Sequence, residues 1–215
     1  HLEGFGSIEG VIQGKSELYL FLAKNSGVCL INSADSKQVA GTLNQEIFSF
    51  GTSSSATVTI QDIDRGADEN IVILAEETKI ISQLKGTYNF TNIAAAVAFG
   101  NYFEIPIAKI KKGIEAYNPT NNRSQWHTTD SNTLVLDAYN ANPSSMKAAL
   151  ESFFSSKKED QVLILGDMLE LGPFTDEEHQ KIVDLIETKN IKETLLIGPE
   201  FNKTKISTSY NYQWF

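Results

Sequence analysis

Two aspartates in this sequence each follow a short apolar run. Thr133–Leu136 is apolar and β-branched and predicts a buried strand, which Asp137 ends directly. Gln161–Leu165 predicts a second strand, and Asp167 follows it after one glycine. If the strands are parallel neighbours joined by a helix, both carboxylates lie at one edge of a sheet. In open α/β sheets, that edge commonly receives ligands.

The loop after Asp137 ends in Asn142-Pro143, an N-cap residue followed by a proline that suits a first helical turn. A helix is therefore expected from Pro143 to about Ser155. A strand, a polar turn and a helix N-terminus together form a geometry that receives anions. Asn140 and Asn142 are our candidates for substrate contacts. An ordinary βα loop with an Asx cap explains the same residues equally well.

One lysine falls on the apolar face of a predicted helix. Ser7 predicts the N-terminal cap of a helix that runs to about Lys24. Its apolar side chains recur at helical spacing and predict a stripe that faces the core: Ile8, Val11, Ile12, Leu18, Tyr19 and Leu22. Lys15 lies in the middle of that stripe. Either its stem carries the charge to the surface, or its amine is desolvated, has a lowered pKa and faces a site. A neutral amine can react with carbon dioxide to form an anionic carbamate.

Two asparagines and one arginine are candidates for nucleotide contacts. Asn89 and Asn92 lie at i, i+3 in the first turn of an alanine-rich helix that we expect to be buried. Their amides offer both a donor and an acceptor, which suits the edge of an adenine, although helix capping explains them too. Arg123 follows the helix-breaking stretch 118–122. An arginine at a domain junction can bind phosphate through two hydrogen bonds, and a surface arginine is the alternative.

Three sequence motifs resemble a known family. LDAYNANPSSM begins at Leu136 and GDMLELG begins at Gly166, and together they resemble the carboxyl-terminal domain of the Mur ligases. Within that family they are most similar to the MurF group, which adds D-alanyl-D-alanine. HLEGFGS at the start resembles an internal segment of the same group, and the resemblance covers nearly all 215 residues. The chain is therefore expected to be a fragment without the amino-terminal domain, the G-x-x-x-x-G-K-[ST] phosphate loop and the carboxyl-terminal end.

The resemblance implies roles for the candidate residues. Mur ligases carry a carboxylated lysine, and in MurF-like members it comes fourteen residues after a magnesium-binding histidine. Lys15 follows His1 at that spacing. The resemblance therefore implies that Lys15 is the carbamate site and that His1 is a metal ligand.

The resemblance also implies the residues that contact the nucleotide. Asn89 matches the asparagine that the family places at the adenine, in an HN-x-x-N-type motif. Tyr88 stands where the family usually has histidine, so a role for that histidine does not transfer. Arg123 matches the arginine of a P-x-x-x-R motif between two domains, and Asp137 is implied as a further nucleotide contact.

The activity that the resemblance implies is ATP-dependent peptide-bond formation in peptidoglycan precursor synthesis. ATP, with Mg²⁺, phosphorylates the terminal carboxylate of UDP-N-acetylmuramoyl-tripeptide, and the amine of D-alanyl-D-alanine attacks the acyl phosphate. Such chemistry depends on positioning and charge neutralisation more than on a protein nucleophile. The fragment by itself is expected to be inactive. Two alternatives remain: another ligase of this fold, such as a folylpolyglutamate synthetase, and a non-catalytic nucleotide-binding module.

The expected fold class is α/β. Residues 1–119 are expected to form part of a central ATP-binding domain, a mixed sheet with helices. Residues 120–215 are expected to form part of a Rossmann-like carboxyl-terminal domain with the order βαβαβ. The remaining predicted strands are Val28–Asn32, Thr57–Asp64, Ile71–Glu76, Lys79–Leu84, Ser124–Thr128 and Glu193–Ile197, with a hairpin loop at Asp64–Asp68. The remaining predicted helices are Pro106–Tyr117 and Thr175–Thr188, the latter with a capping box of Thr175 and Glu178.

Composition excludes several classes of function. The net charge is −9 and no basic run occurs, which argues against nucleic acid as a partner. The sequence shows no signal peptide or long apolar span, so membrane insertion is not expected. The single cysteine, Cys29, is expected to be a reduced core residue in a cytoplasmic protein. The three histidines form no zinc-like cluster, and His179 is expected to be structural. The expected assembly is a monomer.

Overall fold

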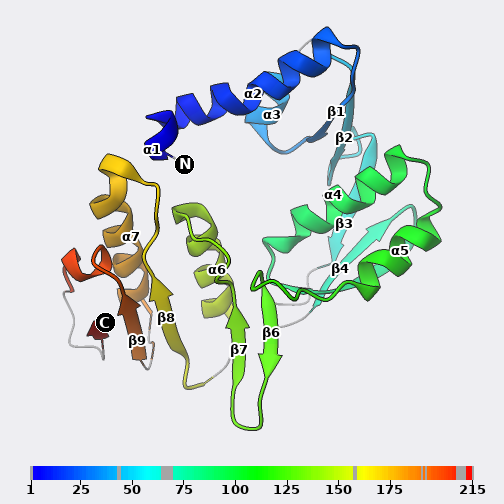
Figure 1. Cartoon of the computed structure of the whole chain (residues 1–215). Helices are drawn as coiled ribbons and strands as arrows, with labels where there is room; N and C mark the ends of the chain where they lie inside the picture. The colour runs from blue at the N-terminus through cyan, green and yellow to red at the C-terminus, as the bar shows by residue number, and fades with distance from the viewer. Residues whose placement is uncertain are drawn as a thin grey trace. The chain divides into compact units, whose positions relative to one another are not determined.

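The computed structural model describes residues 2–42, 45–63, 70–156, 159–189, 191, 193–206 and 212–214. The chain divides into two compact units (Figure 1). We call Ile12–Leu136 the central unit, and His1–Val11 together with Asp137–Phe215 the terminal unit. The division by contacts differs from the predicted bounds at two places, since residues 1–11 fall in the terminal unit and residues 120–136 in the central unit.

The central unit is built on a five-stranded mixed sheet. Its strands run in the spatial order β1-β2-β3-β4-β5, with β1, β2 and β3 parallel and the pairs β3–β4 and β4–β5 antiparallel. Their bounds are Cys29–Asn32, Ile47–Gly51, Val58–Ile63, Asn70–Ala75 and Thr78–Lys85. Four of these strands confirm predictions, whereas β2 was not predicted. The predicted loop Asp64–Asp68 lies outside the described residues.

Two helices, α4 (Asn89–Tyr102) and α5 (Ile107–Ala116), pack against this sheet. Val97 of α4 is fully buried in one core with strand residues such as Ile60 and Ile80. The helices approach each other closely at Gly100, where an added Cβ atom would lie 2.6 Å from Cδ1 of Ile110. A larger residue at position 100 would therefore have to displace the Ile110 side chain, which favours glycine there although it lowers helix propensity.

The first helices depart from the predicted packing. Short α1 (Leu2–Phe5) precedes α2 (Ile8–Lys24), and α3 (Ser36–Gly41) follows β1. Ser7 caps α2 as predicted, since its Oγ accepts from the N–H of Gly10 at 3.1 Å. The prediction that the apolar stripe of α2 faces a core is confirmed only in part, since Val11, Ile12, Tyr19 and Leu22 are half-buried. No described residue of α2 is buried, and Ile8 and Leu18 are 56% and 58% exposed.

The strand predicted at Thr133–Leu136 has an unexpected partner. This strand, β7, pairs antiparallel with β6 (Gln125–Thr128) in a two-stranded sheet, with Gln125 opposite Leu136. It is only partly buried, because Leu134 is exposed. The prediction that Asp137 and Asp167 end neighbouring parallel strands is therefore wrong, since β7 and β8 belong to different sheets among the described strands.

The terminal unit has its own parallel sheet, in the order β10-β9-β8. Strand β8 spans Val162–Gly166, β9 spans Glu193–Ile197 and β10 spans Tyr212–Trp214. Helices α6 (Pro143–Ser155) and α7 (Thr175–Glu187) share one core with this sheet and with the 3₁₀ turn η2 (Phe201–Lys203). A second 3₁₀ turn, η1 (Gly172–Phe174), contacts α7.

Of the two helix caps predicted for this unit, the one at Asn142 is confirmed and the one at Thr175 is wrong. Asn142 caps α6 as predicted, because its Oδ1 accepts from the N–H of Ser145 at 3.0 Å. The capping box at Thr175 is wrong. The chain already turns through η1, so Phe174 is the N-cap residue, and the Thr175 hydroxyl donates backward to the Gly172 carbonyl at 2.8 Å. Glu178 lies 2.7 Å from the ammonium of Lys181 instead.

Candidate functional site

The turn that leads into α4 holds the asparagine proposed for the adenine. Gly86 has a φ of 81°, which reverses the chain after β5. Asn89 is only 4% exposed, and its Nδ2 donates to the Lys85 carbonyl at 2.7 Å. Its Oδ1 accepts from Nδ2 of Asn92 at 3.0 Å. The capping alternative is not what is observed, because the N-cap residue, Tyr88, makes no side-chain cap bond. The exposed amide of the pair is therefore that of Asn92.

Arg123 lies in a linker that is fastened to this turn. The arginine is exposed, while its neighbour Ser124 is buried. The Ser124 hydroxyl lies 2.9 Å from the Tyr88 hydroxyl. Two residues beyond Ser124, the ring of Trp126 makes a cation–π contact with the Lys85 ammonium, which lies 4.2 Å from the ring centroid. The structure therefore brings together the two segments that carry Asn89 and Arg123.

Lys15 lies on α2 and is exposed. It belongs to the central unit, as Asn89 and Arg123 do. His1, its proposed partner at the metal, lies outside the described residues. The carbamate assignment stays a prediction. The exposed position of Lys15 matches the alternative in which its stem carries the charge to the surface.

The proposed ligands after β7 are all exposed and belong to the terminal unit: Asp137, Asn140 and Asn142. The amide oxygen of Asn140 accepts from the N–H of Ala141 at 2.9 Å. Asn142 and Ser145 form a reciprocal capping box at the start of α6. The side chain of Asn142 is therefore engaged by its helix, which favours the Asx-cap alternative for this residue.

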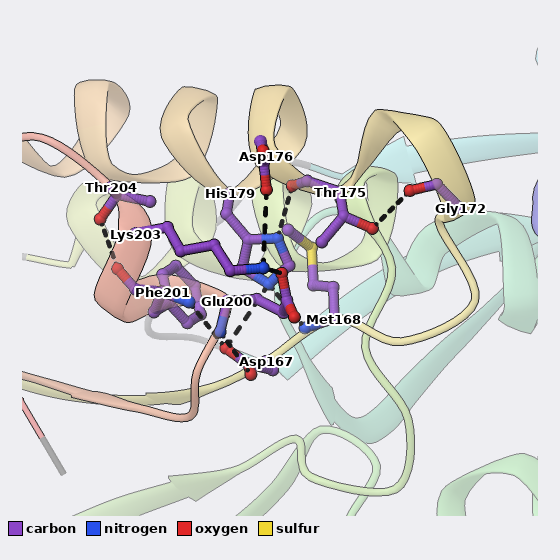
Figure 2. A network of polar contacts seen from close by, with 10 residues as sticks. All are labelled: Asp167, Met168, Gly172, Thr175, Asp176, His179, Glu200, Phe201, Lys203 and Thr204. Carbon is purple, nitrogen blue, oxygen red and sulfur yellow. Dashed lines mark hydrogen bonds and ion pairs between the residues drawn. The ribbon is translucent and has the colours of Figure 1, made fainter.

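Asp167, which follows strand β8, is half-buried and lies at the centre of a network of polar contacts (Figure 2). Its two carboxylate oxygens accept from the N–H groups of Glu200 and Phe201, at 3.0 and 2.9 Å, which fixes the start of η2. Beside it lies the fully buried ring of His179, with Nε2 at 3.7 Å from the carboxylate. An added Cβ atom at Gly198 would overlap the Asp167 carboxylate, and the φ of Gly198 is 123°. Asp167 is thus a structural residue of the terminal unit.

His179 is structural, as predicted. Its Nδ1 lies 2.7 Å from the Thr175 carbonyl, and its Nε2 accepts from the N–H of Met168 at 3.0 Å. The ring of Phe201 packs edge-on against it, with 4.6 Å between ring centroids. Figure 2 shows how these contacts join the GDMLELG loop, α7 and η2.

Sequence reasoning missed Tyr88 and Ser124 as partners. They are separated by 36 positions, and no local pattern links them. A signal existed in part: polar residues in a proline-containing break indicate a turn, and Asn122 and Ser124 do adopt positive φ angles of 55° and 49°.

Two negative findings apply to the part of the chain that the structure describes. Among those residues, no group of three or more His, Cys, Asp or Glu side chains is arranged to hold a metal ion. None of the described helices combines the length and apolar character that a membrane crossing requires.

Comparison with known families covers most of the chain. Residues 1–100 match the family described as Mur ligase middle domain. Residues 122–210 match the family described as Mur ligase, glutamate ligase domain. The boundary between the two matches lies near the linker that contains Arg123.

Individual relatives agree with this assignment. The chain is 31% identical to the UDP-N-acetylmuramoyl-tripeptide--D-alanyl-D-alanine ligase of Bacillus subtilis over 201 residues, which is 92% of this chain and 44% of that protein. The chain spans about half the length of the curated relatives it matches.

Solved structures show the same fold. MurF from Acinetobacter baumannii superposes with a TM-score of 0.78 at 24% identity, covering 99% of this chain and 48% of that one. MurF ligase from Thermotoga maritima in complex with ADP superposes with a TM-score of 0.80 at 16% identity, covering 100% and 49%. The predicted α/β fold class is confirmed.

Proposed function

This chain belongs to the Mur ligase family, and we propose that it is part of an ATP-dependent ligase that joins D-alanyl-D-alanine to UDP-N-acetylmuramoyl-tripeptide. The observation that carries the proposal is the similarity of nearly the whole chain to ligases of that name. The setting is cytoplasmic synthesis of the peptidoglycan precursor, by a monomeric enzyme.

The central unit supplies the nucleotide contacts in this proposal. In the pair of asparagines, Asn92 has the exposed amide that can offer a donor and an acceptor to the adenine edge, while Asn89, the residue that matches the family motif, is buried and accepts from Asn92. Arg123 offers a planar fork of donors to phosphate oxygens. The contacts of Tyr88 with Ser124 and of Lys85 with Trp126 hold the segments of Asn89 and Arg123 close together. This supports binding of the same nucleotide by both residues, because adenine and phosphate belong to one molecule.

Asp137, Asn140 and Asn142 are proposed contacts of the terminal unit with nucleotide and substrate. Asn142 is the weakest of the three, since its side chain already caps α6. Lys15 is the proposed carbamate site.

His1 is the single residue of this chain that we propose as a magnesium ligand. The described residues on their own do not form a site that fits the ion, because no suitable cluster of ligands occurs among them. We therefore assign no step of the reaction to a metal position.

The test is substrate-dependent ADP release by the full-length protein that contains this sequence. With ATP, Mg²⁺ and UDP-N-acetylmuramoyl-tripeptide present, ADP is expected to form only after D-alanyl-D-alanine is added, together with the pentapeptide product. A parallel reaction with L-glutamate and a folate acceptor is the control for the folylpolyglutamate synthetase alternative. Product from the folate reaction alone would overturn the proposal, and ATP binding without any product would favour the non-catalytic module.

A further inference from the structure

Two cross-links join the turn before α4 to the linker that carries Arg123. The Tyr88 and Ser124 hydroxyls form a hydrogen bond of 2.9 Å, in which either can donate. The Lys85 ammonium lies over the Trp126 ring, 4.2 Å from its centroid, within the range of a cation–π contact. Both contacts lie inside the central unit.

The backbone of the linker needs such support. Asn122 and Ser124, on either side of Arg123, have φ angles of 55° and 49°. This left-handed conformation is unfavourable for residues other than glycine, and serine lacks the partial tolerance of asparagine. Such residues persist where the surroundings hold them in place. Ser124 is 7% exposed, so its hydroxyl is held inside the unit by its contact with Tyr88.

The same turn also fixes the proposed adenine ligand. Tyr88 directly precedes Asn89, whose Nδ2 donates to the Lys85 carbonyl at 2.7 Å. The turn 85–89 therefore contacts both the buried asparagine, through Lys85, and the linker, through Lys85 and Tyr88. Through these contacts, the side chains of Lys85 and Tyr88 fix the position of the Arg123 backbone relative to Asn89.

We propose that Tyr88 is a positioning residue for Arg123: its hydroxyl fastens Ser124 and thereby holds the arginine beside the start of α4. The inference rests on the proposed function for its catalytic consequence. The tether itself is a property of this chain, and it can be measured without substrate.

The first experiment measures the tether by hydrogen exchange on this chain. Tyr88→Phe removes one oxygen and leaves the ring in place. Exchange of the amides in 122–126 is expected to rise about 3- to 10-fold, because the hydrogen bond to Ser124 is lost. Tyr117→Phe, at a residue that is 50% exposed in the same unit, is the matched control and should change nothing there. Unchanged exchange in Tyr88→Phe would overturn the proposal.

A double-mutant cycle separates the hydrogen bond from a general effect on stability. Ser124→Ala should raise exchange in 122–126 as Tyr88→Phe does, and the double variant should be no worse than either single variant. Fully additive effects would show that the two hydroxyls act independently, which would contradict the tether.

The second experiment asks whether the tether acts through Arg123, in the full-length ligase. Tyr88→Phe is expected to lower kcat about 3- to 10-fold while the KM for ATP changes less, because Asn89 keeps its own bonds. In an Arg123→Ala background, Tyr88→Phe should cost nothing further. An equal loss in both backgrounds would overturn the positioning role. If the parent protein shows no ligation at all, the proposed function fails, while the exchange result still decides the tether.

Discussion

The backbone N–H of Met168 donates to Nε2 of His179 at 3.0 Å, so this buried imidazole carries its proton on Nδ1, which faces the Thr175 carbonyl. With this tautomer, each ring nitrogen has a hydrogen-bond partner. The GDMLELG loop is held at Met168 by a side chain eleven positions further along the sequence. This motif is therefore fixed by packing of the terminal unit.

His179→Ala should destabilise the terminal unit by about 2–4 kcal/mol, since it leaves a cavity and an unsatisfied N–H at Met168. Urea unfolding followed by circular dichroism measures the loss. His127→Ala makes the same chemical change at an exposed residue and should stay within about 0.5 kcal/mol of the parent chain. A loss as small as that of the control would contradict the structural role of His179.

Arg123→Ala in the full-length ligase should cost about 2–4 kcal/mol of transition-state stabilisation, because a charge-assisted donor near the transferred phosphoryl group is lost. The measurement is kcat/KM for ATP. Lys112→Ala, which removes an exposed cation from α5 of the same unit, is the control and should have little effect. Near-normal kcat/KM in Arg123→Ala, with the fold intact, would rule out the phosphate contact.

Lys15→Ala in the full-length ligase should abolish most activity, and short-chain carboxylic acids should restore part of it by occupying the position of the carbamate. Lys24→Ala, which removes a lysine from the last turn of the same helix, should keep its activity and show no such rescue. Full activity in Lys15→Ala would show that the exposed lysine is an ordinary surface residue.

The 215-residue chain alone should not turn over ATP, because no G-x-x-x-x-G-K-[ST] loop occurs in it to hold the β- and γ-phosphates. Phosphate release from the purified chain is the measurement, with the full-length ligase as the positive control. Turnover that depends on both ligase substrates would be the contrary result.

Cys29 should react slowly with thiol reagents while the chain is folded. Its side chain is 1% exposed, and burial raises the pKa of the thiol, so less thiolate is present near pH 8 than in an unfolded chain. Labelling by a disulfide reagent should be at least about tenfold faster in urea than in buffer. Equal rates would mean that the strand β1 opens readily.

The sequence patterns predicted individual elements better than their partners. The apolar run Thr133–Leu136 correctly indicates a strand, but periodicity carries no information about which strand lies beside it. That choice depends on contacts such as the ladder that places Gln125 opposite Leu136. The expected joint edge of Asp137 and Asp167 failed for this reason.

In the candidate site, too, the sequence indicated individual residues better than their contacts. Motif position was enough to select Asn89 and Arg123, whose segments the structure does bring together. Tyr88 and Ser124, which join those segments, carry no signal at helical or strand spacing. Only the folded chain shows that Tyr88, which departs from the family pattern, contacts Ser124 beside Arg123.

The contact between Gly100 and Ile110 has a consequence for how related sequences can vary. An alanine at position 100 would force the Ile110 side chain to move, because its Cβ atom would lie 2.6 Å from Cδ1 of the isoleucine. A smaller residue at position 110 would make room for it. The two positions should therefore covary across homologues, with a larger residue at one accompanied by a smaller residue at the other, so that their summed side-chain volume stays nearly constant.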